Sequence, residues 1–159
     1  MLHIKLITVG TLKERYLREA VAEYEKRLGA YAKVEILELK EGRVAESPSP
    51  AEISTTLEKE AEAILAAIPP RAFTIALCVE GQSRSSEQLA SLLESAMSQS
   101  SELCLIIGSS HGLSPRIKQA ASYRLSVSAL TFPHQLMRVL LLETVYRSLS
   151  ILHGSKYHK

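Results

Sequence analysis

The chain has 159 residues and a formal net charge of +2, with 46% hydrophobic and 23% charged residues, which is the composition of one ordinary globular domain. It contains no apolar run of about 18 residues that could span a membrane, and its first residues lack the long apolar region of a signal peptide, so we expect a cytoplasmic protein without a membrane partner. The chain also contains no Asp, which excludes Ser-His-Asp triads, Asp-based magnesium sites and EF-hands.

Five short segments rich in Ile, Leu and Val are predicted to be strands buried on both faces of a sheet. They are Leu2–Val9, Val34–Leu39, Phe73–Val79, Leu103–Ile107 and Tyr123–Val127. Apolar residues spaced by three or four predict helices that follow these strands. They are Glu14–Leu28, Ala51–Ile68, Ser86–Met97, a short helix from Pro115, and Pro133–Leu149. The alternation predicts an α/β fold with a mostly parallel sheet flanked by helices.

The last predicted helix is unusual because its core, residues 136–142, is apolar nearly all round. A helix with apolar residues on every side must bury more than one face. A subunit interface is the simplest explanation, so we expect a homodimer.

Charge is unevenly distributed along the chain. Residues 1–110 carry 12 Lys and Arg and 16 Glu, a net charge of −4, whereas residues 111–159 carry seven Lys and Arg and one Glu, a net charge of +6. The C-terminal part also contains four of the five histidines. A basic end of this kind is expected of a protein that binds a phosphate backbone, although a solvated helical face has the same charge pattern.

Three loops rich in Gly and Ser follow the last three predicted strands. They are residues 80–83, 108–112 and 128–132. The carboxyl ends of parallel strands meet at one edge of a sheet, where open α/β folds bind ligands, so a pocket is expected there. The loops contain neither a GxGxxG fingerprint nor a Walker A lysine, which disfavours a standard dinucleotide or nucleoside triphosphate site.

The cysteines and histidines do not predict a metal site, because no cluster of them has metal-ligand spacing. Cys78 and Cys104 lie in apolar runs without a CxxC partner. Both are therefore expected to be buried, reduced thiols.

Three segments occur in a specific order in the second half of the chain, namely IIGSSHGLSP, LSVSALTFPHQLMRVLLLETVYRS and a terminal YHK. With the opening IKLITVGTLKERY and the following EYEKRL, they resemble the RlmH (YbeA-like) family of SPOUT-class methyltransferases over the whole chain. One departure is visible, since the family usually has a second glycine where this chain has Ser109. The resemblance implies a single SPOUT domain over residues 1–159, dimerisation, and a trefoil knot over about 103–159.

The resemblance also implies a reaction and a cofactor. The family transfers a methyl group from S-adenosylmethionine to N3 of a pseudouridine in large-subunit ribosomal RNA, and no metal is needed. Ribosomal RNA is then the partner, and the small net charge suggests that the assembled ribosome is the substrate. The implied cofactor contacts are Leu77, Gly108, Val127, Ser128, Ala129, Leu130, Thr131 and Phe132.

Four residues are candidates for work on the RNA. His158 is the first candidate for a general base or for positioning the acceptor, although it could instead belong to a frayed terminus. Tyr157 could stack on the target base or hydrogen-bond it. His134 and Arg138 are four residues apart and so share a helix face. This pair could meet a phosphate or the carbonyl groups of the target base, while His134 could instead bond local backbone.

Two other functions compete with a methyltransferase. A non-catalytic RNA-binding or ribosome-associated factor could keep the same fold without the chemistry. A small α/β hydrolase is the weaker alternative, because the chain has no GxSxG sequence and no Asp.

Overall fold

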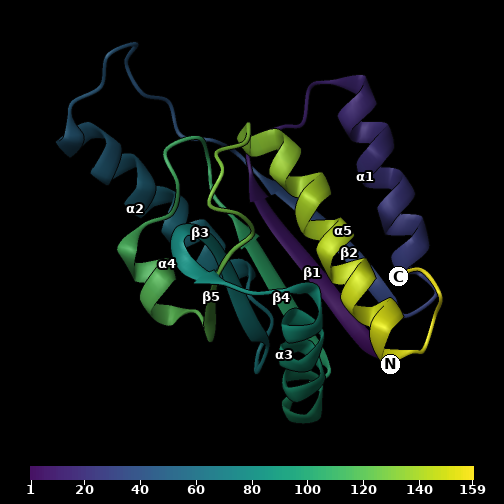
Figure 1. Ribbon diagram of the computed structural model, residues 1–159. Coiled ribbons are helices and arrows are strands. Elements are labelled where there is room, and N and C mark those ends of the chain that lie inside the picture. Colours follow the sequence, from purple (N-terminus) through teal and green to yellow (C-terminus); the bar gives the residue numbers. More distant parts are fainter.

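The computed structural model describes all residues, 1–159, and contains one sheet of five parallel strands in the order β2-β1-β4-β3-β5 (Figure 1). The strands are β1 (Leu2–Val9), β2 (Ala32–Leu39), β3 (Phe73–Ser83), β4 (Glu102–Ile107) and β5 (Tyr123–Ser126). The helices are α1 (Arg15–Leu28), α2 (Pro50–Ala67), α3 (Ser86–Gln99), α4 (Pro115–Ala120) and α5 (His134–Leu152). The predicted α/β class, the parallel sheet and the order of the elements are confirmed.

Helices cover both faces of the sheet (Figure 1). Helices α1, α3 and α5 pack on one face, where Leu6, Leu105 and Leu142 belong to the larger core cluster. Helices α2 and α4 pack on the other face against Ile7 and Ile106. These residues follow the alternation of side chains along a strand, because odd and even positions point to opposite faces. The central strands β1, β3 and β4 carry buried apolar residues on both faces, as a parallel sheet between two helical layers requires.

Local signals in the sequence explain where the helices begin. The Ser49 hydroxyl accepts a hydrogen bond from the Glu52 N–H at the start of α2, and Pro50 occupies the first turn, where no N–H is needed. At the start of α3, Ser85 and Gln88 bond each other's backbone N–H groups at 3.1 and 2.9 Å. This capping box satisfies two donors that the helix itself leaves free.

Strand β3 departs from the prediction at its carboxyl end. It was expected to end at Val79, but it resumes after an irregularity, because Leu125 of β5 pairs with both Leu77 and Gln82. Residues 78–81 therefore bulge out of the sheet. A Cβ atom on Gly81 would lie 2.6 Å from the Leu125 carbonyl carbon, so the bulge needs glycine at this close approach. The alternation of apolar residues gives no sign of such a bulge.

The two cysteines differ in burial. Cys104 is fully buried in β4, and burial raises the pKa of its thiol to about 12. Cys78 lies in the bulge and is only half-buried. The expectation of a core thiol is therefore right for Cys104 and wrong for Cys78. Neither cysteine forms a disulfide. None of the helices has the length and apolar character needed to cross a membrane.

Candidate functional site

A cavity of about 340 Å³ lies at the carboxyl edge of the sheet, where the segments after β3, β4 and β5 converge. Its walls come from residues 77–80, 107–113, 126–128 and 130–132, with Lys118, His134 and Met137 added from α4 and α5. The volume is in the range of small-molecule sites. Loops 108–112 and 128–132 meet at this edge as expected, whereas of residues 80–83 only Glu80 lines the cavity, because Gln82 and Ser83 continue β3.

The loop after β4 is held in a tight turn by its backbone. Ser109 and Gly112 form an isolated bridge, and the Gly112 N–H donates to the Ser109 carbonyl at 2.9 Å. A Cβ atom on Gly108 would lie 2.1 Å from the Gly112 carbonyl oxygen, so no other residue fits at position 108. Ser109, where the family usually has glycine, is buried, and its hydroxyl accepts a hydrogen bond from the His111 N–H at 3.3 Å.

The loop after β5 leaves its backbone free for a ligand. Residues 128–132 take part in no backbone–backbone hydrogen bond. The loop is instead shaped by serine side chains, since the Ser126 hydroxyl donates to the Ser128 carbonyl and the Leu130 N–H donates to the Ser128 hydroxyl. Leu130 is 73% exposed, and Val79 of the bulge is 92% exposed. Both line the cavity, so its rim is apolar and open.

Seven of the eight predicted cofactor residues line this cavity. They are Leu77, Gly108, Val127, Ser128, Leu130, Thr131 and Phe132. The eighth, Ala129, is exposed in the same loop but does not line the cavity. The structure brings these residues together, and their contact with a methyl donor stays a prediction.

Several lining residues were not found from the sequence. Lys118 of α4 is one of them, and it forms an ion pair with Glu80, the first residue of the expected loop 80–83, which enters the cavity because of the bulge. The hydrogen bond from the Lys118 ammonium group holds the pKa of the Glu80 carboxyl below its usual range. Met137 was overlooked because it lies inside the apolar run of α5. A Lys on a short amphipathic helix and a Met in an apolar helix carry no signal of a site.

The structure separates the two members of the predicted His134–Arg138 pair. His134 lines the cavity from the first turn of α5. Arg138, expected to face RNA, is instead buried with 3% of its side chain exposed, and its guanidinium lies 2.6 Å from the Glu38 carboxylate. It also donates to the carbonyl oxygens of Val9 and Gly10. Because a buried charge needs a partner, Arg138 ties α5 to the ends of β1 and β2.

This assignment predicts the effect of removing the carboxylate. Glu38→Gln leaves the buried Arg138 guanidinium without its counter-charge, so we expect the free energy of unfolding to fall by about 2 kcal/mol, less than for a fully buried pair because Glu38 is 39% exposed. The matched control is Glu35→Gln on the same strand, whose carboxylate is 66% exposed and 3.8 Å from Lys5, with an expected change below about 0.5 kcal/mol. Urea unfolding measures both, and equal losses would contradict the assignment.

The C-terminal tail is docked rather than frayed. The Tyr157 hydroxyl donates to the Glu143 carboxylate at 3.0 Å. His158 contacts Arg147 through Nδ1 at 3.2 Å and Glu87 through Nε2 at 2.8 Å, and the hydrogen bond from His158 lowers the pKa of the Glu87 carboxyl. Glu143 and Arg147, the two side chains of α5 that hold the tail, form an ion pair with each other at 2.6 Å. The tail is thus fixed to α5 and α3.

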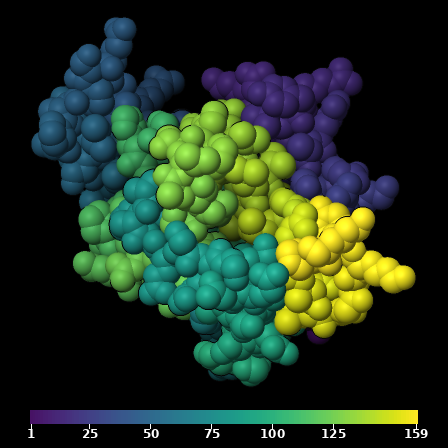
Figure 2. All heavy atoms as spheres, viewed as in Figure 1, coloured from purple at the N-terminus to yellow at the C-terminus, as the bar shows by residue number.

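The docked tail lies far from the cavity of its own chain. His134 at the first residue of α5 lines the cavity, whereas Tyr157 and His158 follow its last residue, Leu152. The 19 residues of α5 span about 28 Å. Figure 2 shows the loop after β5 and the C-terminal residues as separate surfaces on the same face. The cofactor residues and the tail therefore do not form one site within a single chain.

Comparison with known proteins agrees with this architecture. A family model described as "Predicted SPOUT methyltransferase" matches residues 2–158. A protein of Bacillus pumilus named ribosomal RNA large subunit methyltransferase H is 46% identical over 99% of this chain and 100% of its own length. A protein of the same name from Streptococcus thermophilus is 48% identical over 98% of this chain and 99% of its own length.

Solved structures share the fold at low sequence identity. A probable methylase family protein from Haemophilus influenzae aligns with 100% of this chain and 72% of its own, with a TM-score of 0.56 and 14% identity. A second solved structure, described as giving insights into the 2-OH methylation of C/U34 on tRNA, aligns with 96% of this chain and 98% of its own, with a TM-score of 0.53 and 17% identity. The match of a family model to almost the entire chain, together with these relatives, shows that the chain belongs to the SPOUT methyltransferase family.

Proposed function

We propose that this protein is an S-adenosylmethionine-dependent methyltransferase that methylates N3 of a pseudouridine in large-subunit ribosomal RNA, and that it acts in the cytoplasm, where ribosomes are found. The observation that carries the proposal is the cavity at the carboxyl edge of the sheet, in a chain whose relatives are named for methylation of this RNA. The choice of pseudouridine and of its N3 atom rests on the resemblance of the C-terminal segments.

The residues around the cavity fit the methyl donor. Leu77, Val127 and Phe132 offer apolar side chains to the adenine ring. The backbone groups of residues 128–132, apart from the Ser128 carbonyl and the Leu130 N–H, offer donors and acceptors to its polar edge. Gly108 lets the turn after β4 close against the Gly112 carbonyl, and this turn forms one wall of the cavity. When bound, the donor supplies an electrophilic methyl group on a sulfonium sulfur.

The chemistry left to the chain is alignment and removal of one proton. N3 of pseudouridine is an imide nitrogen that is protonated at neutral pH, so its proton must leave as the methyl group arrives. We assign proton acceptance to His158 and contact with the base to Tyr157. The two ring nitrogens of His158 contact Arg147 and Glu87. One of these contacts must therefore open when RNA binds.

The position of the tail supports a homodimer with a shared site. The outer side of α5 carries the half-buried apolar side chains of Leu136, Val139 and Leu140, which a second subunit would cover. If the two α5 helices run antiparallel across a two-fold axis, the tail of one subunit reaches the cavity of its partner. The family also implies that the loops after β4 and β5 belong to a trefoil knot.

Binding of the donor separates this proposal from a non-catalytic ribosome-binding factor. We expect isothermal titration calorimetry to detect S-adenosylmethionine binding at micromolar to millimolar concentration, and labelled donor to methylate ribosomes more efficiently than naked RNA. Assembled ribosomes are the expected substrate because they add contacts that a small protein of low net charge lacks. No heat at millimolar donor, combined with retained ribosome binding, would establish the non-catalytic alternative.

A further inference from the structure

A second cavity of about 540 Å³ lies at the edge of the sheet, between the β3 bulge, α4 and β5. Its lining is almost entirely polar. The lining residues are Glu80, Gly81, Gln82, Lys118, Gln119, Ala121, Ser122, Tyr123 and Arg124. None of the predicted cofactor residues is among them. We call this cavity the edge groove.

The edge groove adjoins the 340 Å³ cavity that we propose binds the methyl donor, which we call the donor cavity. Glu80 and Lys118 line both, and the bulge of residues 78–81 forms the wall between them. The Glu80–Lys118 ion pair joins the bulge to α4 at this wall. A chain with one nucleotide at the donor cavity can therefore place its next nucleotide in the edge groove.

The charges of the edge groove suit a phosphate. Arg124 of β5 is exposed and forms no ion pair, although its charge helps to lower the pKa of the Glu80 carboxyl. The only carboxylate in the lining, Glu80, is already occupied by Lys118. An anion entering the groove would thus meet a free guanidinium and no unpaired carboxylate, which favours charge-assisted bonds to phosphate oxygens.

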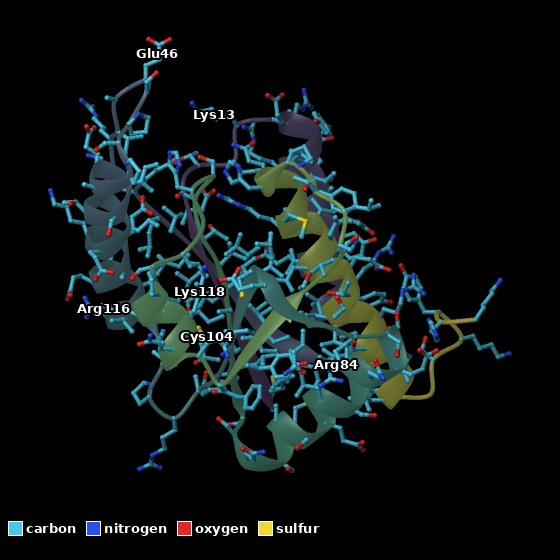
Figure 3. The ribbon with its side chains drawn as sticks, turned by 60° about the vertical axis from the view of Figure 1, so that its left-hand side comes forward. Lys13, Glu46, Arg84, Cys104, Arg116 and Lys118 are labelled. Carbon is cyan, nitrogen blue, oxygen red and sulfur yellow. The ribbon has the colours of Figure 1, made fainter.

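The remaining groups suit a nucleoside. The Arg84 Nε donates to the Tyr123 hydroxyl at 2.7 Å, and the Arg84 guanidinium lies 5.9 Å from the centre of that ring. The Gln82 amide oxygen already accepts from Arg84 and Tyr123, so its NH2 group and the amide of Gln119 are the groups that can bond base edges or sugar hydroxyls. Figure 3 marks Arg84, which follows β3, and Lys118, which belongs to α4. A protein partner would need apolar anchoring pockets, and the lining offers only Ala121 and the Tyr123 ring.

We propose that the edge groove binds the RNA strand next to the target nucleotide, with Arg124 on a backbone phosphate. The proposal rests on the proposed function, since it names where the substrate of that site runs. Arg124 here positions RNA and takes no part in methyl transfer. Phosphate contacts of this kind fix register without reading sequence, and each contributes to the salt dependence of binding.

The test uses Arg124→Ala with Lys59→Ala as the matched control. Lys59 is exposed on α2 and lines neither cavity. We expect Arg124→Ala to raise the KM for ribosomes about tenfold and to leave kcat and donor affinity unchanged. It should also reduce the steepness of the plot of log ribosome affinity against log salt concentration by about 0.7 to 0.9. A photo-crosslinking amino acid at Gln119 should label the RNA beside the modified nucleotide. Lys59→Ala should change none of these quantities.

The two proposals fail in different ways. If wild-type protein methylates ribosomes but Arg124→Ala behaves like Lys59→Ala and Gln119 labels no RNA, the edge groove is not the RNA path. Loss of donor affinity in Arg124→Ala would also overturn the assignment, since it would make Arg124 part of the donor site. If wild-type protein transfers no methyl group but Gln119 still labels ribosomal RNA, the groove assignment stands and the proposed function fails.

Discussion

Replacing Gly108 with Ala is expected to weaken binding of the methyl donor by about 100-fold, because the added methyl group has no space. Its Cβ atom would lie 2.1 Å from the Gly112 carbonyl oxygen and 2.6 Å from the Gly112 carbonyl carbon. Both atoms are backbone, so the whole turn after β4 must move. That turn is one wall of the donor cavity. Calorimetry with S-adenosylmethionine measures the loss.

The control for this substitution is Gly29→Ala, the same chemical change at the end of α1. Gly29 has a φ of −56°, which any residue adopts, and lies outside the donor cavity. It should keep wild-type donor affinity. Circular dichroism identifies a Gly108→Ala protein that has lost its fold. In that case Leu130→Ala, which shortens an exposed side chain lining the same cavity, takes its place and should also weaken donor binding. Full donor affinity in a folded Gly108→Ala protein would contradict the assignment of this cavity.

Removing the His158 side chain is expected to slow methyl transfer at least about tenfold while leaving donor affinity unchanged, because general-base catalysis is lost and the donor cavity is untouched. His158 lies beyond the far end of α5 from His134, which lines that cavity. Single-turnover kinetics on ribosomes measure the rate, and calorimetry measures the donor affinity. Equal losses of rate and donor affinity would show instead that the tail builds the donor cavity.

Mixing the two variants tests whether the site is shared between subunits. A dimer of one Gly108→Ala chain and one His158→Ala chain has one intact cavity facing one intact tail, provided that each tail serves its partner. Random exchange then restores activity to about a quarter of wild type. Glu87→Gln removes the charge of the carboxylate that contacts His158. The activity of this variant therefore shows how much the docking of the tail on α3 matters for methyl transfer. Activity of the mixture no higher than the average of the separate variants would contradict the shared site.

The sequence predicted the elements because local signals and periodicity agree along this chain. The helix predicted from Ser86 begins at that residue, and the helix predicted from Ala51 begins one residue earlier, at Pro50. The loops of the donor cavity could be placed because carboxyl ends of parallel strands always share one edge. Neither step requires knowledge of long-range contacts.

Other features depend on contacts between residues far apart in sequence. The burial of Arg138 follows from Glu38, one hundred residues earlier, and helix periodicity places Arg138 beside His134 without revealing that partner. The β3 bulge follows from the close approach of Gly81 to β5. The docking of His158 depends on Glu87 of α3. The edge groove could not be predicted from the sequence for the same reason, because three separate segments of the chain form it.

The most direct test of the proposed function is methyl transfer from labelled S-adenosylmethionine to assembled ribosomes, separated subunits and naked RNA, followed by mapping of the modified nucleotide. We expect label at N3 of one pseudouridine in large-subunit ribosomal RNA, with assembled ribosomes as the best substrate and no label with Gly108→Ala. Donor binding without label in any RNA, or label on a ribose or on another base, would contradict it.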